Sequence, residues 1–277
     1  MALTAFQSEV LRLLADNRRN NPESYVAGGL SLNYTLGTPR VSRDVDVFHD
    51  SVEALAKSWE NDRATLEANG FHVAVLRKYE SFVEANVSRE GNALEIQWAW
   101  DSAYRFFPLK DDPVAGFTLH PLDLATNKLA ALVGRTEVRD WIDVITCFKH
   151  VQPLAFLLCA ACGKDPGFSP SSMLEYIARR RYSQVEIDGK IVPHDAYDAA
   201  SLSRSWHEEI DRTRGTLSIL PRESAGKAVL TNDGELFRGT DAELQSALAA
   251  GEIVFHEGHL GGAWPRIVER QRGETPC

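Results

Sequence analysis

Hydrophobic positions in the first hundred residues switch between helical spacing and short apolar runs bounded by polar turns. Apolar residues at helical spacing predict helices over residues 4 to 17, 30 to 36 and 51 to 69. Short apolar or alternating runs predict strands over residues 25 to 27, 44 to 48, 71 to 76, 81 to 87 and 93 to 99. This order predicts an α+β fold, in which a small mixed sheet is flanked by helices.

From residue 119 the pattern becomes mainly helical. Helices are predicted over residues 124 to 133, 136 to 150, 154 to 162 and 169 to 181, the first two with Asp123 and Thr136 as N-caps. Alternation around Asp188-Gly189 and around Asn232-Asp233-Gly234 predicts hairpins over residues 184 to 192 and 228 to 238. Further helices are predicted over residues 202 to 214 and 241 to 251.

These patterns divide the chain into three parts. Residues 1–118 form the predicted sheet domain, residues 119–183 a helical domain, and residues 184–277 a small α/β C-terminal extension. The sequence indicates no function for the extension.

The strongest chemical signal is a glycine pair followed by two aspartates. Gly28-Gly29 ends the strand at residues 25 to 27, and Asp44 and Asp46 lie two positions apart on the next strand. Alternation along a strand places both carboxylates on one face. Mg²⁺ is commonly bound by one or two carboxylates together with substrate phosphates, and a glycine turn offers free N–H groups to phosphate oxygens. The pattern therefore indicates a site for an Mg-nucleoside triphosphate, although two acids on a strand also occur on plain solvated faces.

The glycine pair and the aspartates resemble the nucleotidyltransferase superfamily of DNA polymerase beta, whose pattern is G-G or G-S followed by D-x-D or D-x-E on a strand. Within it the chain is similar to the AbiEii/AbiGii toxin family. There, R-x-S or R-S precedes the dyad, as Arg40-Val41-Ser42 does here. The family's downstream motif K-x-x-A, R and R-D-x-x-D is matched by Lys128-Leu129-Ala130-Ala131, Arg135 and Arg139-Asp140-Trp141-Ile142-Asp143.

This resemblance implies a nucleotidyltransferase fold for residues 1–118 and transfer of a nucleoside monophosphate to an acceptor hydroxyl. Mg²⁺ is the implied cofactor, with Asp44 and Asp46 as its ligands. Gly28 and Gly29 would contact the triphosphate through their backbone, and Lys128 would place a positive charge on it.

Four further residues are candidates for the site. Glu95, on a later strand, is the candidate third carboxylate, which would help to bind the metal and receive the proton of the attacking hydroxyl. Ser42 would bind a phosphate, Arg139 would contact the nucleotide, and Asp143 is implied to be catalytic. Each also has an ordinary explanation: a surface glutamate, a serine bonded to backbone, and an Arg139–Asp143 helix pair at i,i+4.

Composition limits the remaining possibilities. The formal net charge of −9 argues against a large nonspecific surface for nucleic acid but leaves room for a local basic site. No run of 18 apolar residues and no signal-like N-terminus are present, which predicts a cytoplasmic protein without a membrane partner. The four cysteines are expected to be free thiols, and Cys159 and Cys162 to pack in the core.

Three functions remain open from the sequence. The first is a toxin of a toxin–antitoxin pair that adds nucleotides to an acceptor such as the 3′ end of tRNA and has a cognate antitoxin as partner. The second is a nucleotidyltransferase that modifies a small molecule, such as an antibiotic. The third is a catalytically silent domain that binds a nucleotide or a partner.

Overall fold

A central mixed sheet carries the N-terminal half of the chain. The structure is a computed structural model that describes residues 3–193 and 196–265. Within these residues the sheet has seven strands in the order β3-β4-β5-β2-β1-β8-β7. Their bounds are β1 Ser24–Ala27, β2 Asp44–His49, β3 His72–Tyr79, β4 Phe82–Arg89, β5 Asn92–Trp100, β7 Lys110–Asp112 and β8 Gly116–Thr118. Because β2 runs antiparallel to β1 and parallel to β5, the predicted mixed sheet is confirmed.

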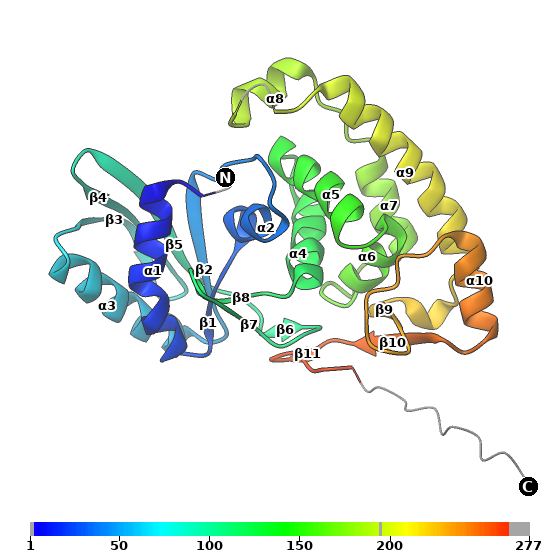
Figure 1. Cartoon of the computed structure of the whole chain (residues 1–277), viewed down its shortest axis with the longest axis horizontal. Coiled ribbons are helices and arrows are strands. Elements are labelled where there is room, and N and C mark those ends of the chain that lie inside the picture. The colour runs from blue at the N-terminus through cyan, green and yellow to red at the C-terminus, as the bar shows by residue number, and fades with distance from the viewer. Residues whose placement is uncertain (1–2, 194–195, 266–277) are drawn as a thin grey trace, which may run out of the picture.

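Helices cover both faces of this sheet (Figure 1). Helices α1 (Ala5–Arg19) and α3 (Val52–Ala68) pack on one face, where Val45 and Val47 of β2 join an apolar core with Trp59 and Trp98. Helix α2 (Gly28–Leu36) lies on the other face, between the sheet and the helical half of the molecule. The alternation of β2 therefore turns its valines toward α1 and α3 and its aspartates toward α2.

The helical half contacts the sheet through α2 and continues into the C-terminal region. Its elements are α4 Pro121–Gly134, α5 Val138–His150, α6 Leu154–Ala161, α7 Pro170–Ala178, α8 Gln184–Lys190, α9 Ala199–Ile219, the 3-10 turn Arg222–Ser224, β9 Lys227–Thr231, α10 Asp241–Ala249 and β10 Ile253–Glu257. A single apolar core extends from α4 to β9. Cys159 and Cys162 are buried free thiols, as expected, and Cys162 belongs to this core. Two short strands, β6 (Tyr104–Arg105) and β11 (His259–Leu260), pair below it.

Of the two hairpins predicted for the C-terminal region, the first is wrong and the second forms only in part. Residues 184 to 190 form α8, which begins at a capping box between Ser183 and Glu186. This S-x-x-E signal was present in the sequence and outweighs the alternation that predicted strands. In the second case β9 pairs mainly with β10. The chain also turns back after β9, where an antiparallel bridge joins Leu230 to Leu236 and Phe237 N–H donates a hydrogen bond of 3.1 Å to the carbonyl of Val229.

The predicted N-caps of α4 and α5 are also wrong. His120 caps α4 and Glu137 occupies the N-cap position of α5. Asp123 is instead fully buried and accepts hydrogen bonds from the backbone N–H groups of Phe106 and Phe107. The carboxylate thus holds the segment that leads to β7 and β8, which the sequence patterns did not predict.

Within the described residues, no single helix is long and apolar enough to cross a membrane. The adjoining helices α5 and α6 meet that requirement only together and are bent by 114° at their junction.

A buried ion pair fastens α1 and α3 to the sheet. Arg18 and Asp62 are fully buried, with 3.6 Å between Arg18 Nη2 and Asp62 Oδ2. The same carboxylate accepts hydrogen bonds of 2.9 Å from Trp98 Nε1 and from Asn17 Nδ2. A buried charge is tolerated only when it is paired and hydrogen-bonded, and Asp62 meets both conditions.

We predict that Asp62→Ala lowers the free energy of unfolding by about 3–5 kcal/mol, because it leaves the guanidinium of Arg18 buried without a counter-charge. Urea unfolding followed by tryptophan fluorescence would measure this loss. Glu60→Ala on the same helix is the matched control. Glu60 contacts Lys78 at the exposed surface, so its removal should cost less than about 1 kcal/mol. Equal effects of the two substitutions would contradict the role given to Asp62.

Candidate active site

The glycine pair lets the backbone at the start of α2 lie close to β2, the strand that carries Asp44 and Asp46. Gly28 and Gly29 open α2 directly after β1, and Ala27 lies opposite Asp46 across the β1–β2 pair. Gly28 has a φ of 67°, and a Cβ atom there would lie 1.7 Å from Asp46 Oδ2. A Cβ at Gly29 would lie 2.7 Å from an Nη atom of Arg40. Both positions require glycine because charged side chains occupy the space that a larger residue would fill.

Asp44 and Asp46 share the partly exposed face of β2, as the alternation predicted. Burial, and then the charge of Asp44, raise the pKa of Asp46 to about 6, against the opposing effect of Lys128 and nearby arginines. Ser42 donates a hydrogen bond of 2.8 Å to Asp44 Oδ1. Ser42 therefore orients a dyad carboxylate in this structure, and phosphate binding by its hydroxyl stays a prediction.

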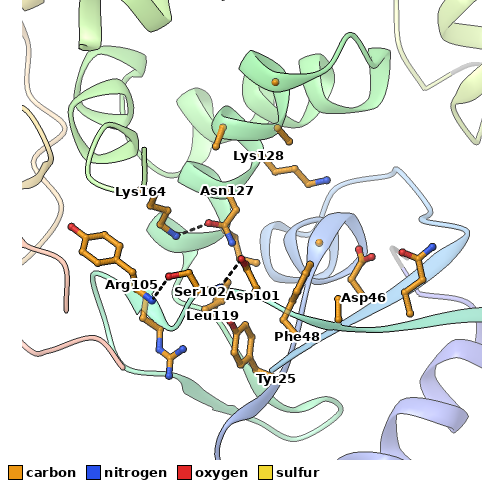
Figure 2. Close-up of a pocket in the computed structure, with 18 of the residues that line it drawn as sticks. Tyr25, Asp46, Phe48, Asp101, Ser102, Arg105, Leu119, Asn127, Lys128 and Lys164 are labelled. Atoms are coloured by element: carbon orange, nitrogen blue, oxygen red, sulfur yellow. Dashed lines mark hydrogen bonds between the residues drawn. The ribbon is translucent and has the colours of Figure 1, made fainter. Parts of the chain in front are cut away.

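Lys128 reaches the dyad from α4 and is held by two acids of α5. Its Nζ lies 3.1 Å from Asp143 Oδ2 and 3.4 Å from Asp140 Oδ1. Burial alone would favour the neutral amine, but the charges of Asp143 and Asp140 raise the pKa of Lys128 above its ordinary value. The side-chain amine of Lys128 is therefore protonated at neutral pH. In Figure 2 it points to the same side of the pocket as Asp46.

Asp143 lies beneath the site instead of on its surface. It is 1% exposed and accepts hydrogen bonds from Arg40 Nε at 3.0 Å and Arg40 Nη2 at 2.7 Å. The helix pair with Arg139 that the sequence allowed is not formed, because Arg139 extends toward Asp44 instead, 4.0 Å away. Asp143 thus positions Arg40 and Lys128, and a direct catalytic role for it stays a prediction.

Asp140 completes this network of charges. Although burial acts to raise its pKa, hydrogen bonding to Arg135 and the charge of Lys128 hold the pKa of Asp140 below its ordinary value. Arg135 Nε donates to Asp140 Oδ2 at 2.7 Å. The acids of α5 therefore keep the cations charged and fix where they point.

Two adjoining cavities meet at Asp46. The smaller one, of about 180 Å³, is lined by ten residues, which are Gly29, Arg40, Ser42, Asp44, Asp46, Gln97, Lys128, Arg135, Arg139 and Asp140. The larger one, of about 700 Å³, shares Asp46, Gln97, Lys128 and Arg135 with it. Aromatic side chains of Tyr25, Phe48 and Phe82 line the larger cavity, with Asn127 and Lys164 on the side of α4. The first cavity has the size and charge for phosphates, and the second has flat apolar walls suited to a nucleoside.

Glu95 lies on the strand beside the dyad, but Gln97 is the residue that reaches the cavities. The parallel β2–β5 register places Glu95 opposite Asp44 and Gln97 opposite Asp46. Gln97 Nε2 donates to Glu95 Oε1 at 3.0 Å and to Glu84 Oε1 at 3.2 Å. Glu95 lines neither cavity, so its role as a third acid stays a prediction.

A divalent cation fits the donors that are present. Nowhere in the described part of the chain do three carboxylate, imidazole or thiol groups come together as a metal cluster. Asp44 and Asp46 alone would hold Mg²⁺, with phosphate and water completing its shell, which is a common way for proteins to bind this ion. The pKa of Asp46 is raised first by burial and then by the charge of Asp44, and a cation at this position would oppose both effects.

Three residues of the site received no role from the sequence alone. Arg40 and Arg135 stood in the quoted motifs, and their spacing was the available signal. Gln97 shares a strand face with Glu95, but only the register of β5 against β2 shows which of the two enters the site.

Comparison with known proteins supports the fold. No family model matches the chain, and no curated protein matches it in sequence. Among solved structures, a candidate nucleotidyltransferase from H. pylori is 16% identical, with a TM-score of 0.54 over 78% of this chain and 98% of that one. JHP933 from Helicobacter pylori is also 16% identical, with a TM-score of 0.53 over 78% of this chain and 95% of that one.

A third solved structure is MenT4, a nucleotidyltransferase toxin from Mycobacterium tuberculosis. It is 13% identical and covers 79% of this chain and 87% of its own, at a TM-score of 0.41, which is too low to bear on function. The candidate nucleotidyltransferase from H. pylori confirms the predicted nucleotidyltransferase fold. Membership of the AbiEii/AbiGii family stays a prediction.

We predict that Gly28→Ala abolishes binding of Mg-nucleotide. The added methyl group must displace the Asp46 carboxylate, which lies 1.7 Å from the ideal Cβ position. Isothermal titration calorimetry with Mg²⁺ and a nonhydrolysable nucleoside triphosphate would measure the loss.

Gly37→Ala is the matched control for backbone strain. Gly37 has a φ of 65° and nothing within 4 Å of its Cβ position, so alanine there carries the same left-handed penalty, about 1–2 kcal/mol, without touching the dyad. If both variants bound nucleotide equally, the close approach of Gly28 to Asp46 would have no part in binding.

Proposed function

We propose that this chain is an Mg²⁺-dependent nucleotidyltransferase that transfers a nucleoside monophosphate from a nucleoside triphosphate to an acceptor hydroxyl. The observation that carries the proposal is the meeting of three features at one point. The glycine turn at the start of α2, the Asp44–Asp46 pair of β2 and the ammonium of Lys128 all border the smaller cavity or the dyad itself. The fold shared with the candidate nucleotidyltransferase from H. pylori supports the same function.

The charges suit an in-line transfer at the α-phosphate. The acceptor hydroxyl gives up its proton to solvent as its oxygen forms a bond to the α-phosphorus. The bond from that phosphorus to the oxygen that bridges to the β-phosphate breaks, and pyrophosphate leaves. Mg²⁺ bound by Asp44 and Asp46 would supply positive charge to the attacking and leaving oxygens. Lys128, kept protonated by Asp143, offers a further positive charge to the triphosphate, and backbone N–H groups at Gly28 and Gly29 offer hydrogen bonds.

The acceptor that we propose is an RNA 3′ end, with tRNA as a candidate, and the biological role is that of a toxin controlled by a cognate antitoxin. The support for this finer proposal is the R-x-S, K-x-x-A and R-D-x-x-D pattern that resembles the AbiEii/AbiGii toxins. Transfer to a small molecule such as an antibiotic is the alternative.

We predict that Lys128→Ala weakens binding of the nucleoside triphosphate. A hydrogen bond to a charged group is worth about 1.5–3 kcal/mol, so its removal corresponds to a dissociation constant roughly 10- to 150-fold higher. Calorimetric titration would measure this dissociation constant. Lys57→Ala, which removes an exposed lysine of α3, is the control and should leave it unchanged. Unchanged affinity in Lys128→Ala would return this residue to a purely structural role between α4 and α5.

We predict that Asp46→Asn abolishes nucleotidyl transfer without loss of fold. Burial and Asp44 already oppose a charge on Asp46, so the neutral amide should keep the melting temperature. Wild-type protein incubated with Mg²⁺, total RNA and a set of nucleoside triphosphates should transfer an α-phosphate label but no γ-phosphate label. The variant should be slower by on the order of 10³-fold, about 4 kcal/mol of transition-state stabilisation.

Asp111→Asn, which removes an exposed acid of β7, is the control and should transfer at the wild-type rate. Label on RNA would support the toxin-type reaction, whereas label on a small molecule from a cell extract would favour the alternative acceptor. Absence of label from every acceptor would refute the enzyme and leave a silent nucleotide-binding domain.

A further inference from the structure

A cleft lined by cations opens beside the dyad. It has a volume of about 180 Å³ and is bordered by Arg40, Val41, Arg43, Arg139 and Lys190. Among the described residues no acidic side chain lines it. In a chain with a formal net charge of −9, four cations around one small cleft are a local reversal of charge. Such a cleft suits an anion with several oxygens.

The C-terminal extension builds one wall of this cleft. Val41 N–H donates a hydrogen bond of 3.0 Å to the carbonyl of Val192, just beyond α8. Helix α8 packs against α5 and ends at Lys190, so its last residue stands beside the Arg40–Arg43 loop. Figure 1 shows α8 near the beginning of α9, on the side of the loop that follows α2. Lys190 and Arg43 thus come together from segments almost 150 residues apart, numbered 43 and 190.

Within the part of the chain that the structure describes, two of the four cations have no acid to neutralise them. Arg40 is paired with Asp143, and Arg139 lies 4.0 Å from Asp44. Across residues 3–193 and 196–265, neither Arg43 nor Lys190 forms an ion pair with a carboxylate, and both are exposed. The cleft therefore carries uncompensated positive charge at an accessible position.

The position of the cleft separates it from the expected place of the nucleotide. The smaller polar cavity shares Asp46, Gln97, Lys128 and Arg135 with the large aromatic-walled cavity, and Arg40 and Arg139 with the cationic cleft. The reacting centre thus lies between two openings of different character. A nucleoside triphosphate can fill the aromatic cavity and the polar centre together, which leaves the cationic cleft for the other substrate.

We propose that the cleft of Arg43, Lys190 and Arg139 binds a backbone phosphate of a single-stranded RNA acceptor and so places its 3′-hydroxyl at the dyad. This inference rests on the proposed function and specifies its acceptor. An RNA 3′ end carries phosphates within one nucleotide of the reacting hydroxyl, whereas a cationic small molecule would be repelled by the same side chains. Arginine and lysine at this site act on phosphate and not on base edges, so the contact is independent of sequence.

The test is the double variant Arg43→Ala/Lys190→Ala. Binding of a short fluorescein-labelled single-stranded RNA is measured by anisotropy over a range of salt concentrations, and nucleotide binding by calorimetry. The variant should bind RNA more weakly, and the slope of log K against log salt should fall by about 0.7 for each phosphate that the protein no longer neutralises. With bulk tRNA as acceptor, the KM of the variant for tRNA should rise, while its dissociation constant for the nucleoside triphosphate stays at the wild-type value.

Two matched variants sharpen the result. Lys57→Ala/Arg204→Ala removes the same charge from exposed positions of α3 and α9 and should leave RNA binding and its salt dependence unchanged. Arg43→Lys/Lys190→Arg keeps the charge and should restore binding. If the Arg43→Ala/Lys190→Ala variant bound RNA with wild-type affinity and salt slope, or failed to bind nucleotide as well, the inference would be overturned.

The binding assay also separates this inference from the proposed function. If the wild-type protein transferred no nucleotide to any acceptor, the proposed function would fail. RNA binding that still depended on Arg43 and Lys190 would then support the cleft as an RNA phosphate site.

Discussion

The buried contact between Arg40, Asp143 and Lys128 is the constraint on which the site depends. Asp143 of α5 holds Arg40 from the loop before β2 and Lys128 from α4, so one carboxylate joins three segments. Removing Asp143 would leave the buried guanidinium of Arg40 without its carboxylate partner, which is far costlier than losing an exposed pair. The position of the helical half against the sheet is therefore coupled to the position of the cations that face the dyad.

This coupling explains how the two aspartates of β2, and opposite them Lys128 and the nearby arginines, can each be held close to groups of like charge. Asp44 and Asp46 repel one another, and the pKa of Asp46 is raised to about 6 by burial and by Asp44. Lys128 and nearby arginines relieve part of that repulsion, while the acids beneath them keep the pKa of Lys128 above its ordinary value. The unfavourable charge that remains on the dyad is what a bound cation would offset.

Sequence patterns predicted those features that depend on the spacing of apolar residues within one element or on a short motif. The two-residue alternation of β2 sufficed to place Asp44 and Asp46 on one face. It could not show that Arg40 pairs with Asp143, because these residues are 103 positions apart and meet only through the packing of α5. Likewise Glu95 and Gln97 are equivalent in alternation, and the register of β5 against β2 decides which of them reaches the cavities. At residues 184 to 190 a local capping box outweighed an alternating pattern, so the error there was one of weighting.

The net charge of the chain is a weak guide to whether it binds an anion, because the electrostatic field near a site is set by the nearest unpaired charged groups. The cations of the cleft come from the loop before β2, from α5 and from the end of α8, and no stretch of sequence contains them together. Screening in salt limits the influence of distant acids to about 10 Å, whereas Arg43 and Lys190 border the cleft directly. An acidic protein can thus have a local cationic surface where its fold brings a few arginine and lysine side chains together. In this chain, the C-terminal extension supplies one of them and thereby becomes part of the site's surroundings.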